Sequence, residues 1–177
     1  KAFSQFDVIP TSIIFPRNQW TNETLKICSE NDITSYRGVQ NHFLYRARKE
    51  ENQTNLLIRA FRLLDHYINL SGSHTYKINS KQSPINIPAS RQMRPYSKRL
   101  AMLESLRLRR IKNAMTHAAK RGETFHLWWH PHNFGSHLES NIMNLTKVYE
   151  HYMSLNDKYG FQSCTMSEAA RDIWTKK

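Results

Sequence analysis

The residue types best suited to chemistry gather between residues 125 and 135, which read Phe-His-Leu-Trp-Trp-His-Pro-His-Asn-Phe-Gly. If this run is a β-strand, Trp128 and His130 share one face while Trp129 points the other way. Pro131 ends the strand because it has no N–H to donate to a neighbouring strand. A strand that carries imidazoles, an amide and a glycine turn at its carboxyl end is typical of the place where α/β folds put their functional groups.

Three interpretations of these histidines are open. They could be ordinary core and loop histidines, although two indoles beside imidazoles form a stacking pocket that a sheet does not need for stability. They could instead hold a metal through His126, His130, His132 and His137. A separation of four residues along a strand places Cα atoms roughly 13 Å apart. That is too far for one metal bonded at ~2.0–2.1 Å unless the side chains converge. The third interpretation is a substrate pocket.

Length and composition predict one globular domain covering residues 1–177. The chain has 177 residues, of which 39% are hydrophobic and 11% aromatic, enough for a single core. No apolar run approaches the ~18 residues of a membrane span, and no signal peptide begins the chain.

Two cysteines indicate neither a disulfide scaffold nor a zinc motif, so a cytoplasmic protein is expected. Because the chain starts at Lys1 without a methionine, we expect a piece of a longer protein.

The formal net charge of +12 suggests an anionic partner. Positive charge is concentrated between residues 91 and 121, where Glu104 is the single acidic residue. The alternative is a solvated helix face whose countercharges lie elsewhere. The basic residues of this segment are Arg91, Arg94, Lys98, Arg99, Arg107, Arg109, Arg110, Lys112, Lys120 and Arg121.

Hydrophobic periodicity predicts short strands that alternate with helices. The strands are expected at residues 12–15, 33–36, 124–129 and 160–164, and the helices at 22–30, 54–70, 97–120, 137–155 and from 166 onward. Residues 71–95 have no stable period and are predicted as a long loop over the face of the fold. Strand–helix alternation implies parallel pairing with right-handed crossovers. The strand ends that carry Arg17, Arg37 and His130 should therefore lie together on one side of the sheet.

Several short motifs together resemble the C-terminal half of bacterial polysaccharide deacetylases, in the branch associated with surface-polysaccharide synthesis. The resemblance spans nearly the whole chain, and the run from Trp128 to Gly135 is its most distinctive part. The other matching segments are Phe15–Gln19, Tyr36–Gly38, Arg62–Asp65, Pro88–Arg91 and Leu108–Lys112.

The resemblance implies an α/β fold, namely the C-terminal portion of a distorted parallel (β/α)7-type barrel. It also implies a hydrolase that removes acetyl groups from the nitrogen or oxygen of sugars with a divalent metal, usually zinc. The family holds this metal with an Asp and a His-x-x-x-His pair on its first strands. The chain has no Asp-Asp pair, and its one His-x-x-x-His, from His126 to His130, lies in the last-strand motif. The metal-binding half is therefore expected upstream, with no metal in this chain, which would be incomplete for catalysis.

The resemblance also implies roles for individual residues. His130 matches the general acid that protonates the departing group, a contribution of roughly 10²–10⁴ in rate. Arg17 matches the arginine that orients the carboxylate of the catalytic base, although the motif here reads Pro-Arg-Asn where many members have Arg-x-Pro. Trp128 and Trp129 would form the wall of the sugar pocket. The remaining candidates for substrate contact are His132, Asn133 and Arg37.

The alternative function is a non-catalytic module that binds an anionic polymer, an acidic polysaccharide or nucleic acid, through the basic helix 97–121. Its binding would fall steeply with salt and would not depend on metal. Nucleic acid is the less favoured partner, because the tryptophan pair follows a strand away from that helix. Open sheet edges also suggest self-association.

Overall fold

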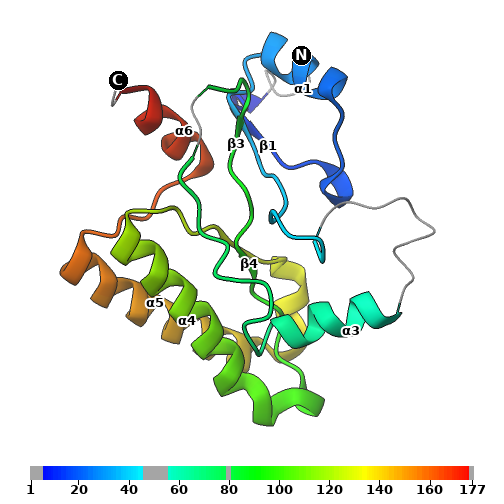
Figure 1. The fold of residues 1–177 in the computed structure, drawn as a ribbon, viewed down its shortest axis with the longest axis vertical. Helices are drawn as coiled ribbons and strands as arrows, with labels where there is room; N and C mark the ends of the chain where they lie inside the picture. The colour runs from blue at the N-terminus through cyan, green and yellow to red at the C-terminus, as the bar shows by residue number, and fades with distance from the viewer. Residues whose placement is uncertain (1–5, 46–55, 79–80, 176–177) are drawn as a thin grey trace. The chain divides into compact units, whose positions relative to one another are not determined.

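The computed structural model describes residues 6–45, 56–78 and 81–175, which form two compact units (Figure 1). The first unit is built from the described parts of 1–39, 78–88 and 163–177, and the second from those of 40–77 and 89–162. Each unit is mixed α/β with a small parallel sheet. That the two form one domain stays a prediction.

The first unit contains a three-stranded parallel sheet in the order β1-β2-β3. Its strands are β1 (Ser12–Ile13), β2 (Ser35–Tyr36) and β3 (Ile85–Asn86), and Ser35 pairs with Ser12 on one side and Ile85 on the other. The two predicted strands are therefore present but shorter than expected. The loop prediction for 71–95 is wrong at β3, because this strand is fixed by pairing with β2 and not by any local pattern.

Helix α1 (Asn22–Glu30) of this unit has the predicted bounds. Thr21 and Thr24 form a reciprocal capping box, in which each side chain accepts the other residue's backbone N–H. Such a cap satisfies N–H groups that have no partner inside the helix. Cys28 is the buried residue of this helix. A short 3₁₀ helix, η2 (Pro16–Asn18), lies between β1 and α1.

The core of the first unit is formed by β3 and the terminal helix. Ile85, Ile87 and Ala170 are buried together, and Met166 and Ala169 pack against them. Helix α6 (Met166–Thr175) starts where predicted, at a capping box in which Glu168 accepts the backbone N–H of Thr165. The strand predicted at 160–164 is not formed.

The second unit pairs β4 (Arg91–Gln92) with β5 (Leu127–Trp128) in parallel. Arg91 lies opposite Leu127, and Gln92 lies opposite Trp128. The strand predicted at 124–129 is present over Leu127–Trp128 only, and β4 again lies in the segment predicted as a loop. The helices of this unit are α3 (Leu56–Asp65), η3 (Lys98–Leu103), α4 (Glu104–Arg121), η4 (Pro131–His137) and α5 (Leu138–Tyr159).

Helices α4 and α5 lie side by side and enclose the larger core (Figure 1). Both helices end at a glycine in the left-handed region, Gly122 with φ 60° and Gly160 with φ 65°, a conformation that glycine adopts without steric cost. Phe125 and Leu127 pack against this core from the segment that contains β5. Its buried side chains are Leu108, Ile111, Met115, Val148 and Leu155.

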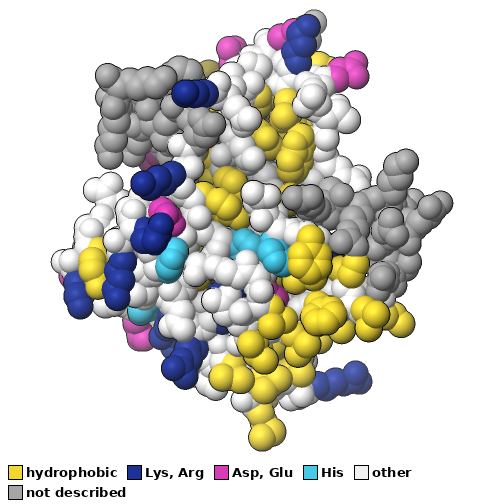
Figure 2. All heavy atoms as spheres, in the orientation of Figure 1, with side chains coloured by type: hydrophobic (Ala, Val, Ile, Leu, Met, Phe, Trp, Pro, Cys, Tyr) yellow, Lys and Arg dark blue, Asp and Glu magenta, His cyan; other side chains and the backbone are white. Residues whose placement is uncertain are grey.

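Helix α3 presents an apolar surface to solvent. Its hydrophobic residues recur at helical spacing, yet Leu57 is 70% and Phe61 50% exposed, and Figure 2 shows hydrophobic side chains gathered over this helix. The helix ends at Asp65 and does not continue to residue 70 as predicted. The reason is local: the Asp65 carboxylate accepts the backbone N–H groups of Leu70 and Ser71 at 3.0 and 2.9 Å, which replaces continued helical bonding.

Within the described part of the chain, no helix combines the length and the hydropathy that a membrane crossing would need.

Candidate active site

The predicted functional run lies where β5 leaves the sheet of the second unit. The backbone carbonyl of Trp128 accepts the N–H of Met93 at 2.8 Å, the bond that follows the β4–β5 pairing. His130 is then extended, and Pro131 begins η4. Because proline fixes φ and lacks an N–H, it suits the first turn of a helix and cannot extend the strand ladder.

The aromatic side chains of this segment fall on two sides, as the strand period predicts. The rings of Trp128 and His130 meet edge to face with centroids 5.3 Å apart, and His130 stacks on His132 at 5.2 Å. On the other side, Trp129 stacks on Phe134 at 6.1 Å. Phe134 is buried, whereas His130 and His132 are exposed. The segment is therefore anchored by the Trp129–Phe134 pair, while Trp128 is half-buried and the imidazoles of His130 and His132 face solvent.

Asn141 of α5 fixes the backbone of η4. This residue is completely buried, its side-chain amide donates to the carbonyl of Phe134 at 3.1 Å, and its oxygen accepts the N–H of Tyr96 at 2.6 Å. Buried polar groups with both partners satisfied fix a local conformation well. Sequence reasoning missed this residue because an asparagine inside an amphipathic helix has no local signature of such a role.

The polar side chains at the tip of the segment are available to a ligand. No hydrogen bond joins the side chain of His130, His132 or Asn133 to another residue within 6–45, 56–78 or 81–175. The structure thus brings together five of the seven predicted site residues: Trp128, Trp129, His130, His132 and Asn133.

The other two predicted residues, Arg17 and Arg37, belong to the first unit. Arg37 follows β2, is 8% exposed, and donates from Nη2 to Asn18 Oδ1 at 3.1 Å. Arg17 precedes Asn18, is exposed, and has a left-handed φ of 52°. Burial lowers the pKa of Arg37 from its usual value. Arg37 thus bonds to the residue that follows Arg17. That the two arginines and His130 lie together stays a prediction.

A buried charged cluster supports β4 from within the second unit, and it was not predicted. The Asp65 carboxylate is fully buried and forms ion pairs with Arg91 and Arg110, which are 2% and 5% exposed. The hydroxyls of Tyr45 and Ser71 each donate to Asp65 Oδ2 at 2.6 Å. Asp65, Arg91 and Arg110 come from three of the separate segments on which the family resemblance rests.

Both arginines of this cluster also hold the loop that follows α3. Nη2 of Arg91 and Nη2 of Arg110 each donate to the carbonyl of Gly72 at 2.6 Å. Burial by itself would raise the pKa of Asp65, but hydrogen bonds from Ser71, Tyr45 and Arg91 outweigh it and lower the pKa. The carboxylate is therefore ionised at neutral pH. Burial of Tyr45, followed by its hydrogen bond to Asp65, raises the pKa of the Tyr45 phenol.

Two histidines near this cluster are held neutral. Burial, followed by the charges of Arg94 and Arg91, lowers the pKa of His66 to about 3. Burial and the charge of Arg91 lower the pKa of His74 to about 4. Both imidazoles therefore remain uncharged across the range in which an exposed histidine titrates.

The basic segment 91–121 is not a uniformly solvated surface. Arg91, Arg107 and Arg110 are buried, and Arg107 pairs with Glu104, whose carboxylate also accepts from Asn144 at 2.8 Å. These arginines serve internal ion pairs and cannot contact a polymer. The surface that the anionic-polymer alternative would use is correspondingly weaker in charge than the sequence suggests.

The divalent metal that the resemblance implies does not fit the side chains that the structure describes. Among those residues, no group of three His, Cys, Asp or Glu side chains could hold a metal ion. The four-histidine site considered from the sequence is therefore not assembled in the described part of the chain.

Comparison with models of protein families, with curated proteins and with solved structures finds no match to this chain.

Proposed function

We propose that this chain is the C-terminal part of a carbohydrate deacetylase with a barrel-type fold, an enzyme that hydrolyses acetyl groups on sugars of bacterial surface polysaccharides. The observation that carries the proposal is the contact of the half-buried Trp128 with the exposed His130, which stacks on the exposed His132, at the carboxyl end of a parallel strand. The run from Trp128 to Gly135 adds the family resemblance. Carboxyl ends of parallel strands are where α/β folds bind their substrates.

His130 would act as the proton donor to the leaving group. Hydrolysis breaks the bond between the acetyl carbonyl carbon and the sugar nitrogen or oxygen, adds the hydroxyl of water to that carbon, and requires a proton on the departing atom. The ring of His130 is exposed, and its neighbours on that side are another imidazole and an indole. It can therefore reach a bound substrate without rearrangement of the core.

Trp128 and Trp129 have different roles in this proposal. Trp128 meets His130 directly and would stack against a flat face of the sugar or against the acetyl methyl group. Trp129 stacks on the buried Phe134 and would hold the segment in place. His132 and Asn133 would contribute hydrogen bonds to hydroxyl groups.

Since the metal set is not assembled among the described residues, this chain would supply the substrate wall and the proton donor. The 177-residue chain is accordingly expected to bind an acetylated sugar without hydrolysing it. Calorimetric titration with the tetramer of N-acetylglucosamine and with the tetramer of glucosamine tests this expectation.

The acetylated tetramer should bind more tightly than the glucosamine tetramer, and Trp128→Ala should weaken its binding at least tenfold. Tyr149→Ala, which removes a 58% exposed aromatic ring from α5, is the matched control and should change affinity less than twofold. Equal affinity for both tetramers, or equal effects of the two variants, would contradict the proposal.

A further inference from the structure

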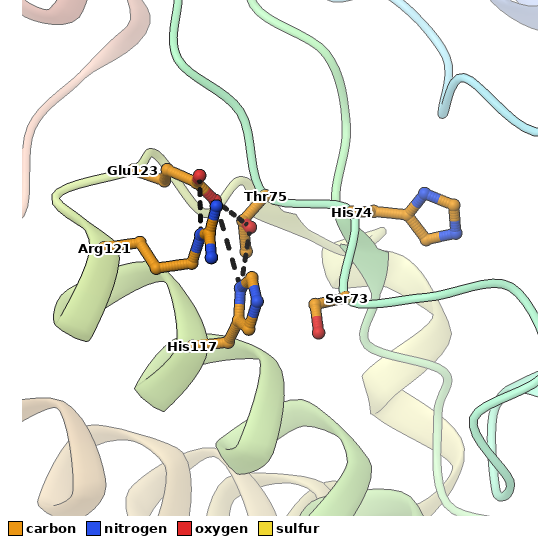
Figure 3. A pocket seen from close by; sticks show the side chains of 6 residues that line it. All are labelled: Ser73, His74, Thr75, His117, Arg121 and Glu123. Carbon is orange, nitrogen blue, oxygen red and sulfur yellow. Dashed lines mark hydrogen bonds and ion pairs between the residues drawn. The ribbon is translucent and has the colours of Figure 1, made fainter.

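A polar hollow of about 410 Å³ lies in the second unit, beside the end of α4 (Figure 3). Glu123 lines it and precedes β5, whereas His130 follows β5, so the hollow and the candidate active site lie toward opposite ends of that strand. The hollow is lined by Ser73, His74, Thr75, His117, Arg121 and Glu123.

The hydrogen bonds in the hollow fix the proton of His117. The Thr75 hydroxyl has one proton, and it donates that proton to Glu123 Oε2. Thr75 Oγ1 also lies 3.0 Å from His117 Nδ1, so this second bond must be donated by the imidazole. A neutral His117 therefore carries its proton on Nδ1, and its Nε2 is a hydrogen-bond acceptor.

Glu123 is the ionised centre of this arrangement. Its side chain is 11% exposed, and it accepts from Arg121 Nε at 3.0 Å as well as from Thr75. These hydrogen bonds lower the pKa of Glu123. Figure 3 shows Thr75, His117, Arg121 and Glu123 turned toward one another, while His74 points away from them.

The charges of the hollow largely offset one another. The carboxylate of Glu123 offsets Arg121, and α4, which ends at Arg121 just before Glu123, places the negative end of its dipole there. Within the described residues, the terminal nitrogens of Arg121, Nε2 of His117 and the hydroxyl of Ser73 have no hydrogen-bond partner. Donors and acceptors thus face the hollow with almost no net charge.

We propose that this hollow binds a neutral, hydroxyl-rich ligand, and specifically one unit of a saccharide chain. Arg121 would donate to a sugar hydroxyl, while His117 Nε2 would accept from a neighbouring one. The size lies within the ~300–1,000 Å³ of small-molecule sites. The class of ligand rests on the hollow itself, whereas the choice of a saccharide rests on the proposed function.

The test is an NMR titration of the 177-residue chain with three probes: the N-acetylglucosamine tetramer, maltotetraose and inorganic phosphate. Both neutral sugars should shift the imidazole ¹⁵N signals of His117, and phosphate should not. Arg121→Gln should lower the affinity measured at His117 at least tenfold. Arg109→Gln removes the same charge from an exposed position of the same helix and should change affinity less than twofold.

A His117 signal that neither sugar shifts, that phosphate shifts more strongly, or that responds equally in the two variants would overturn the inference. The indole N–H signal of Trp128 reports separately on the proposed active site. Loss of the His117 response with a retained Trp128 response refutes the hollow alone. The reverse refutes the proposed function alone.

Discussion

Replacement of Asp65 by asparagine should be among the most damaging single substitutions in the second unit. The change keeps the side-chain shape but removes the one charge that two buried guanidinium groups share, since Arg91 and Arg110 are 2% and 5% exposed. Removing one partner of a buried ion pair costs ~3–5 kcal/mol because it leaves an uncompensated charge out of water. Total domain stability is only ~5–15 kcal/mol, so a large fraction of it would be lost.

Urea denaturation followed by far-ultraviolet circular dichroism measures this cost. With a denaturant slope near ~2 kcal/mol/M, the midpoint of Asp65→Asn should fall by roughly 2 M. Asp157→Asn makes the same chemical change at an exposed position of α5 and should alter stability by less than ~0.5 kcal/mol. Adding Arg91→Met to Asp65→Asn should recover part of the loss, because one of the two stranded charges is then gone.

A cost of no more than ~1 kcal/mol for Asp65→Asn would contradict this prediction, since the cluster would then contribute no more than an exposed pair. So would a double variant that is less stable than Asp65→Asn by the full cost of losing Arg91 alone. In that case the two residues would act independently.

The neutral His66, the hydrogen bonds of Asn141 and the buried arginines of the basic helix can each be tested separately. The free energy of unfolding should fall as pH drops from about 6.5 toward 3, because His66 is protonated in the unfolded chain but not in the folded chain, where its pKa is about 3. This difference in pKa corresponds to roughly 4–5 kcal/mol. Unfolding free energies measured across this pH range should vary less in His66→Gln. Asn141→Ala should lower the free energy of unfolding by ~1–3 kcal/mol, since it leaves the N–H of Tyr96 and the carbonyl of Phe134 without their partner. The same variant should weaken binding of the acetylated tetramer. Asn113→Ala, at an exposed position, should do neither. If the chain bound heparin through segment 97–121, affinity would fall steeply with salt; because Arg107 and Arg110 are buried, we expect weak binding, and a nanomolar affinity at 150 mM salt would favour the polymer-binding alternative.

Local signals predicted the helices well. Thr21, Thr165 and Gly122 mark helix ends through contacts within a few residues, so the sequence contains these signals directly. Gly160 was instead expected in a strand and α5 was expected to end at residue 155, whereas the helix extends to Tyr159. The strands β3 and β4 were missed because each has two residues and lies in a segment rich in Ser, Asn and Pro. Their extended conformation comes from pairing with β2 and β5, which no local pattern encodes.

The site was predictable only at its surface. The strand period correctly placed Trp128 with His130 and apart from Trp129, because alternation along a strand is a local property. The support beneath it was not predictable, since Arg91 meets Asp65 from 26 residues away and Asn141 reaches Tyr96 from 45 residues away. Helical spacing likewise identified α3 but not that Leu57 and Phe61 would face solvent.

The most direct measurement of the central claim is the response of the Trp128 indole N–H signal to an acetylated sugar, with the signal assigned from a Trp128→Phe variant. We expect the N-acetylglucosamine tetramer to shift this signal in a saturable manner, the glucosamine tetramer to shift it far less, and His130→Gln to weaken the response. An indole signal that stays unchanged at millimolar acetylated tetramer would mean that Trp128 does not bind an acetylated sugar.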